Sequence, residues 1–149
     1  MLSLLRARSW EYGAVITYRT GNDVDLDEFI AVYVDSRLAE RRPADDRERM
    51  KTMLEEANLV ITAWDGDAMV GISRSITDFA YATYLSDLAV KLDYQGQGIG
   101  TELIRLTRRA APEAMVILLA APAARDYYPQ IGMKGHDSAW LLYPGEEPK

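Results

Sequence analysis

The sequence contains no cysteine among its 149 residues and only one histidine, His136. Without thiols the chain cannot form disulfides, use a thiolate nucleophile, or ligate zinc or an iron–sulfur cluster through cysteine. A single imidazole also excludes a metal site built from several histidines. We therefore predict a protein that binds no metal.

Long apolar runs and an excess of positive charge are also missing. No stretch approaches the ~20 apolar residues that a transmembrane helix requires. Arg6 and Arg8 interrupt the start of the chain, which therefore lacks the apolar core of a secretory signal. The 17 Lys and Arg residues against 23 Asp and Glu give a formal net charge of −6, which disfavours nucleic acid and anionic membranes as partners. A cytoplasmic protein is expected.

The chain has the ordinary composition of a folded protein, with 48% hydrophobic and 27% charged residues. No internal repeat, low-complexity segment or linker divides it, so a single domain over residues 1–149 is predicted. Apolar periodicity and turn residues indicate a mixed α/β fold. Helices are predicted at residues 25–42, 44–57, 99–111 and 123–131, and strands at residues 14–19, 59–64, 68–76, 83–90, 115–120 and 140–143.

Local signals support this assignment. Asp25 followed by Glu28 three positions later is typical of a capping box at the start of a helix. Asp65-Gly66 between two apolar runs is typical of a tight hairpin turn. Trp64 and Trp140 are predicted to lie in or near the core.

A cluster of glycines lies where the strand ending at Val90 gives way to a helix. Glycines at such a point let backbone amides approach a ligand without obstruction by side chains. The amides at a helix start and the helix dipole together hold an anion without any lysine. The segment is a candidate pyrophosphate cradle and reads Gln95-Gly96-Gln97-Gly98-Ile99-Gly100-Thr101.

Other interpretations of the glycine cluster are possible. A P-loop is rejected because no lysine follows the glycines, as Gly-x-x-x-x-Gly-Lys-Ser/Thr requires. A dinucleotide fingerprint is weakly supported, since Thr101 occupies the position of its third glycine and the cluster lies far from the first strand. A third interpretation is also possible, in which the glycine turn binds no ligand and only lets the helix pack closely on the strand.

Two segments of the chain resemble the GNAT acyltransferase superfamily. Its coenzyme A signature, Gln/Arg-x-x-Gly-x-Gly/Ala after an apolar strand end, matches Gln95 to Gly100 preceded by Asp87-Leu88-Ala89-Val90. A second family segment, Tyr-x-x-x-Gly-Phe, corresponds to Tyr128-Pro129-Gln130-Ile131-Gly132-Met133, with methionine in place of phenylalanine. The resemblance implies a twisted, mostly antiparallel sheet of about six to seven strands, flanked by about four helices, with splayed fourth and fifth strands.

The resemblance implies acyl transfer from acetyl-coenzyme A to an amine, carried on a small molecule or a peptide. The backbone of Leu88, Ala89 and Val90 would meet the pantetheine arm and the thioester. The amides from Gln95 to Thr101 would hold the pyrophosphate, and within this segment only the Gln95 side chain is singled out. A homodimer is implied by the same analogy.

The resemblance also suggests candidates for the chemistry. Tyr128 matches a family tyrosine near the coenzyme sulfur, where a phenol can donate a proton to the departing thiolate. Asp87 and Ser86 lie beside the expected thioester, and because successive strand residues face opposite sides, only one of them is expected to face the acceptor. Family members often carry glutamate at the position that aligns with Ser86. Because this chain has serine there, Asp87 is the candidate base or amine-orienting group.

Several alternatives stay open at this point. A base acting through water, or capture of the small neutral fraction of the amine, could replace Asp87. The family often has asparagine where this chain has Ala121, which removes any contact from that side chain. Arg74 and Asp78, placed after the third strand, could line the acceptor pocket or belong to the surface.

The missing cysteine favours direct transfer without a covalent enzyme intermediate. The acidic balance of the chain would suit a cationic acceptor. A non-catalytic module that binds or senses acyl-coenzyme A is the alternative from another functional class.

Overall fold

The computed structural model describes residues 15–149. The expectations for Ala14 and for the start of the chain lie outside these residues. The described chain forms two compact units, residues 15–118 and residues 119–149, and each is described by itself. Within residues 15–149, no helix is both long and apolar enough to cross a membrane.

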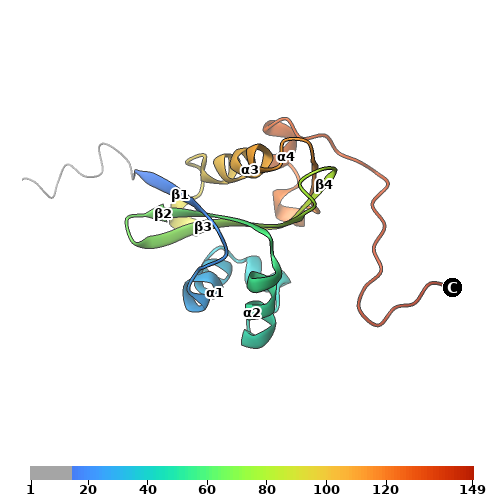
Figure 1. The fold of residues 1–149 in the computed structure, drawn as a ribbon, viewed down its shortest axis with the longest axis horizontal. Coiled ribbons are helices and arrows are strands. Elements are labelled where there is room, and N and C mark those ends of the chain that lie inside the picture. Colours follow the sequence, from blue (N-terminus) through green and yellow to red (C-terminus); the bar gives the residue numbers. More distant parts are fainter. Residues whose placement is uncertain (1–14) are drawn as a thin grey trace, which may run out of the picture. The chain divides into compact units, whose positions relative to one another are not determined.

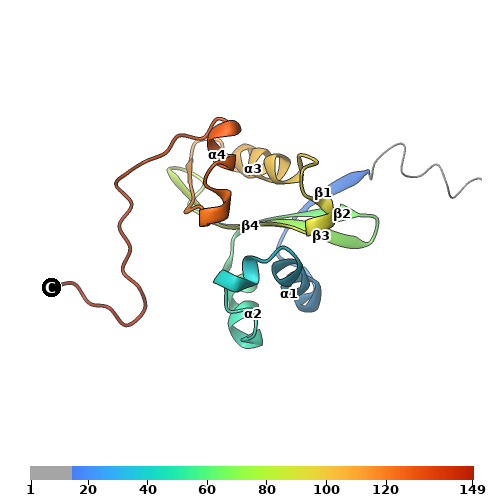
Figure 2. The same ribbon diagram turned by 180° about the vertical axis from the view of Figure 1, so that it is seen from behind.

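The first unit is built on a five-stranded sheet whose strands are adjacent in chain order. The first three pairings are antiparallel and the last is parallel. Two helices, α1 and α2, cover one face of the sheet and α3 covers the other (Figure 1), as the opposite view also shows (Figure 2). The strands are β1 (Ile16–Thr20), β2 (Leu59–Asp65), β3 (Ala68–Thr77), β4 (Ala82–Val90) and β5 (Met115–Ile117), and the helices are α1 (Leu26–Asp35), α2 (Arg47–Glu56) and α3 (Ile99–Ala110).

The start of α1 follows the expected side-chain cap. The Asp25 carboxylate accepts the backbone N–H of Glu28 at 3.0 Å, which confirms the predicted capping interaction. α1 ends at Asp35 rather than near residue 42, because Arg37 adopts a left-handed conformation and a short 3₁₀ helix, η1 (Leu38–Arg41), follows. α2 begins later than predicted because Asp46, in an extended conformation, caps it.

The core has one apolar layer on each side of the sheet. The layer under α1 and α2 includes Phe29, Met50 and Ile72, and the layer under α3 includes Ile61 and Leu103. Alternating strand residues supply the two layers, as expected for a sheet covered on both faces. A Cβ at Gly71 on β3 would lie 3.3 Å from both Ile99 and Leu103, so this glycine lets α3 pack close to the sheet.

The β2–β3 hairpin confirms the predicted turn, with Gly66 in the left-handed region at φ 59°. The prediction of six to seven strands is wrong for the described residues. β5 is shorter than predicted, and residues 140–143 form no strand. A strand needs a partner for its backbone ladder, and the sheet contains no strand from residues 119–149.

The second unit contains η3 (Pro122–Ala124) and the one-turn helix α4 (Tyr127–Gln130). α4 covers only part of the predicted helix at residues 123–131. The side chain of Trp140 is 92% exposed, so the prediction that it lies near the core is wrong. Trp64 is buried, as predicted.

Candidate functional site

Strand β4 has one edge that is largely without a strand partner. Along its other edge it pairs with β3 from Thr83 to Val90, whereas it pairs with β5 only from Ala82 to Tyr84. Within residues 15–149, the stretch from Leu85 to Val90 therefore lacks a strand partner on the β5 side. Backbone N–H and C=O groups on such an edge can pair with an extended ligand.

The side chains of this stretch belong to the core. Ala89 is buried in the apolar layer under α1 and α2, and Leu88 and Val90 pack against the layer under α3. The Gln95 side chain, singled out within the glycine cluster, donates to the Val90 carbonyl at 2.9 Å. The segment consequently offers mainly its backbone to a ligand.

The glycine cluster forms an open turn between η2 (Leu92–Tyr94) and α3. Gly96 and Gly98 adopt left-handed conformations, with φ 77° and 84°, which favour glycine over other residues. A Cβ at either position would meet no atom within 4 Å, so the turn faces open space.

The N-terminus of α3 is not capped by a side chain. Gly98 is its N-cap residue, and the first helical hydrogen bond runs from the Glu102 N–H to the Gly98 carbonyl at 3.0 Å. The amides of Ile99 and Gly100 precede that bond and have no acceptor inside the helix. The buried Ile99 side chain anchors the helix start, and amides without a helical acceptor at a helix start are groups that can bind an anion.

Asp87 on β4 lies in a buried cluster of ion pairs. Its side chain is fully buried, and its two oxygens accept from the Nε atoms of Arg42 and Arg74, each at 2.5 Å. The Tyr33 hydroxyl donates to Oδ2 at 2.5 Å. We call Tyr33, Arg42, Arg74, Ser86 and Asp87 the Asp87 cluster.

The Asp87 cluster shifts the pKa of Asp87 and the pKa of Tyr33. Burial alone would raise the pKa of Asp87, but Arg74, Tyr33 and Arg42 outweigh it and lower this pKa below its ordinary value. Burial and the adjacent Asp87 carboxylate raise the pKa of Tyr33 well above its ordinary value. Asp87 is therefore ionised and saturated with donors, and Tyr33 keeps its proton.

A β-bulge places Ser86 and Asp87 in the same cluster. Arg74 pairs with Asp87 and the next β3 residue, Ser75, pairs with Leu85, so Ser86 is an extra residue in β4. The Ser86 Oγ accepts from Arg74 at 2.9 Å and donates to Asp87 at 3.3 Å. The expectation that Ser86 and Asp87 face opposite sides is therefore wrong, because a bulge breaks strict alternation.

Two members of the cluster were missed by sequence reasoning. Tyr33 has the spacing of a core position in a helix, and Arg42 precedes Pro43 at an expected helix end. The Nη2 of Arg42 also donates to the Ser86 carbonyl at 2.8 Å, so this arginine binds the backbone of the bulge. Nothing in the local sequence connects these residues to β4.

Arg74 and Asp78 occupy different environments. Arg74 lies within β3 rather than after it, and it is 7% exposed. The Asp78 carboxylate accepts the backbone N–H groups of Ala80, Tyr81 and Ala82, and these bonds lower its pKa. Asp78 thus organises the β3–β4 turn.

The second unit carries the candidate acid. Tyr128 is half-buried, and its ring stacks edge-on against Tyr127 with 5.2 Å between ring centroids. Burial and the charge of Tyr127 raise the pKa of Tyr128 above its ordinary value. Its phenol is consequently protonated at neutral pH and able to donate a hydrogen bond or a proton.

A groove of about 590 Å³ runs between α2 and β3 in the first unit. Arg74 on β3 lines it and also bonds to Ser86, so the groove lies beside the bulge in β4. The other charged lining residues, which sequence reasoning did not single out, are Asp46, Glu48, Arg49 and Glu56. They all come from the α2 region.

Comparison with known proteins adds a family match. A family model described as an acetyltransferase (GNAT) domain matches residues 29–139, about three quarters of the chain. A search of curated protein sequences gives no significant match.

Solved structures share the fold at low sequence identity. A GNAT-family acetyltransferase from Streptococcus pneumoniae is 24% identical, with a TM-score of 0.69 over 89% of this chain and 100% of that one. An aminoglycoside N-acetyltransferase in complex with coenzyme A is 13% identical, with a TM-score of 0.69 over 88% and 95%. A ribosomal-protein-alanine N-acetyltransferase from Brucella melitensis is 18% identical, with a TM-score of 0.67 over 87% and 99%.

Proposed function

Because the chain belongs to the GNAT acetyltransferase family, we propose that this acyltransferase moves the acetyl group of acetyl-coenzyme A directly onto a primary amine. The observation that carries the proposal is the partnerless edge of β4, which leads within a few residues into the uncapped start of α3. A strand edge suits the amide-containing pantetheine arm, and a helix start suits the pyrophosphate.

In this proposal the donor is held mainly by backbone. The edge from Leu88 to Val90 pairs with the pantetheine arm, and the amides from Gly96 to Thr101 bind the pyrophosphate. The left-handed glycines and the dipole of α3 support this assignment. No lysine is required, which agrees with the acidic composition of the chain.

The transfer step needs a neutral amine and a protonated leaving group. The amine nitrogen attacks the thioester carbonyl, the C–N bond forms, the C–S bond breaks, and the amine loses one proton. We assign Tyr128 as the group that donates a proton or hydrogen bond to the departing thiolate, which its protonated phenol supports. A coenzyme thiol resembles a cysteine thiol, with a pKa of about 8.5, so this assistance is useful but not indispensable.

The surroundings of Asp87 disfavour a role as proton acceptor. Its oxygens are occupied by Arg42, Arg74, Tyr33 and Ser86, and its pKa is lowered. Both effects make a carboxylate a weak base. We therefore propose that the enzyme captures the amine in its neutral form, and that the proton leaves to water.

Calorimetric titration of the purified protein with acetyl-coenzyme A tests the donor site. Adenosine diphosphate and NAD serve as comparison ligands. Tight binding of acetyl-coenzyme A alone, followed by release of free coenzyme A when amines are added, is the expected result. Equal binding of NAD, or no binding, would overturn the proposal, and binding without turnover on any amine would favour a non-catalytic module.

A further inference from the structure

The groove between α2 and β3 has two carboxylates available for a ligand. Within residues 15–149, neither Glu48 nor Glu56 takes part in an ion pair, and both are exposed. Asp46, by contrast, is occupied as the cap of α2. Glu48 and Glu56 are eight residues apart on one helix, which separates them by about 12 Å along the helix axis.

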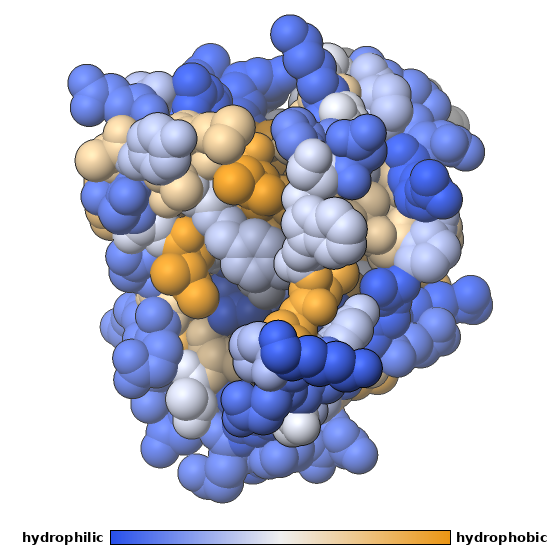
Figure 3. Space-filling view, turned by 90° about the vertical axis from the view of Figure 1, so that its right-hand side faces the viewer, coloured by the Kyte–Doolittle hydropathy of each residue, from blue (hydrophilic) through white to orange (hydrophobic). Residues whose placement is uncertain are grey.

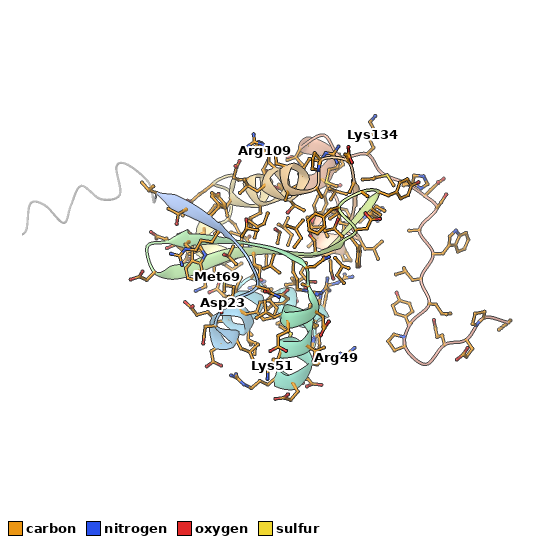
Figure 4. The ribbon with its side chains drawn as sticks, viewed as in Figure 1. Asp23, Arg49, Lys51, Met69, Arg109 and Lys134 are labelled. Carbon is orange, nitrogen blue, oxygen red and sulfur yellow. The ribbon has the colours of Figure 1, made fainter. Side chains whose placement is uncertain are left out.

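The sum of charges around the groove is negative. Arg74, which lines the groove, forms an ion pair with Asp87, and Asp87 also forms an ion pair with Arg42. Arg49 is the remaining guanidinium, and it projects from a different side of α2 than Lys51 (Figure 4). The lining therefore carries three carboxylates, Asp46, Glu48 and Glu56, and two guanidinium groups, Arg49 and Arg74.

An apolar surface lies between the charged positions. Met53 and Ile76 line the groove, and Ile76 is 52% exposed. Ile76 pairs across the strands with Tyr84, which is 40% exposed, so apolar surface continues onto β4. Apolar residues also reach the surface among hydrophilic ones in the space-filling view (Figure 3). Such a surface suits a chain of methylene groups.

We propose that the groove between α2 and β3 binds the acceptor, and that the acceptor is a linear amine whose amino groups are separated by methylene groups. This inference rests on the proposed acetyltransferase activity. One ammonium pairs with Glu48 or Glu56, and the methylene chain lies on Met53 and Ile76. The other amine reaches β4 beside the Ser86 bulge in its neutral form. Its nitrogen gains the acetyl group and loses one proton to water, and the coenzyme leaves as the thiol.

The test compares amines of matched length in steady-state assays. The substrates are 1,5-diaminopentane, its monoamine analogue pentylamine, spermidine, and an aminoglycoside as a cationic but non-linear amine. The expected result is a kcat/KM for the diamine and spermidine about two- to fivefold above that for pentylamine, the effect of one accessible ion pair. A kcat/KM for pentylamine equal to that for the diamine, or an aminoglycoside used better than both linear polyamines, overturns the proposal.

Charge-removing variants locate the binding site. At least one of the variants Glu48→Gln and Glu56→Gln should raise KM for the diamine about three- to fivefold. The KM for acetyl-coenzyme A and the KM for pentylamine should be unchanged. Glu55→Gln is the matched control, because Glu55 lies next to Glu56 but points toward Lys51, with 3.9 Å between their charged atoms. An unchanged diamine KM in both groove variants, or the same increase in the control, refutes the site.

Failure of the proposed function gives a different pattern. If acetyl-coenzyme A does not bind, or if no amine of any class is acetylated, the acetyltransferase assignment fails. The groove is then tested by titrating 1,5-diaminopentane into the wild type and the double variant Glu48→Gln/Glu56→Gln. Binding that weakens in the double variant supports a diamine site, and equal or absent binding overturns it.

Discussion

The Asp87 cluster makes a sharp prediction about stability. Replacing Asp87 with asparagine removes the one carboxylate that lies between Arg42 and Arg74. The net charge of the cluster then rises from +1 to +2, since two guanidinium groups lose their shared counter-ion. The new amide can accept through one oxygen, whereas its NH₂ group faces a donor.

The magnitude follows from burial. Asp87 is fully buried and the Arg74 side chain is 8% exposed, and removing one partner of a buried pair costs about 3–5 kcal/mol. Arg42→Met is the informative comparison, because that side chain is 23% exposed and its loss leaves Asp87 and Arg74 balanced. Arg42→Met should cost about 1–2 kcal/mol, the loss of its hydrogen bonds partly offset by the removed excess charge.

Urea unfolding of the wild type and both variants, measured from pH 3 to pH 8, is the assay. The folded-state pKa of Asp87 is lowered, so the carboxylate stabilises the protein fully above its unfolded pKa of about 3.9. That stabilisation is lost as the pH falls through the folded-state pKa. The difference between wild type and Asp87→Asn should therefore be constant above about pH 5 and narrow below about pH 4.

Two results would refute this reasoning. Arg42→Met could prove as destabilising as Asp87→Asn, which would mean that charge balance does not decide the energetics of the cluster. Alternatively, the difference between wild type and Asp87→Asn could stay constant on acidification, which would mean that the ionised carboxylate is not its source.

Three further predictions concern the proposed reaction. Gly98→Asp should weaken acetyl-coenzyme A binding about 100-fold or more in calorimetry, because a like charge would face the pyrophosphate; Gly66→Asp, at another left-handed glycine in open space, is the control for backbone strain. Tyr128→Phe should lower kcat about 10- to 100-fold with an unchanged Kd for acetyl-coenzyme A, whereas Tyr127→Phe should leave kcat unchanged. In pH–rate profiles, kcat/KM should rise about tenfold per pH unit up to the pKa of the amine, near 10.4 for an alkylamine, because only the neutral amine reacts.

Each of these has a clear contrary outcome. Equal weakening by Gly98→Asp and Gly66→Asp would remove the glycine turn from the donor site. An unchanged kcat in Tyr128→Phe across amines and pH would remove its role as acid. A plateau in kcat/KM that begins near pH 6–7 would indicate a protein base and contradict capture of the neutral amine.

The features that sequence predicts best are those determined by neighbouring residues. The cap at Asp25, the hairpin turn at Gly66 and the glycine turn before α3 each depend on a few consecutive positions. Their backbone conformations follow from residue type, so the local sequence is sufficient to predict them. The edge of β4 was anticipated only through the family resemblance.

The features that sequence misses depend on distant partners. Tyr33 and Asp87 are 54 residues apart in the chain, and no spacing rule brings them together. The bulge at Ser86 adds one residue to a strand, which an alternating pattern does not reveal. Residues 140–143 have the composition of a strand, but composition does not specify which strand would pair with them.

The partnerless edge of β4 has a consequence for how the protein behaves during handling. A strand edge that pairs with no neighbouring strand is a template for pairing with another chain and promotes aggregation. A donor molecule lying along Leu88 to Val90 would occupy that edge as a neighbouring strand does. Bound acetyl-coenzyme A should therefore protect the protein from aggregation. Preparations stored with it should aggregate more slowly than those stored without it.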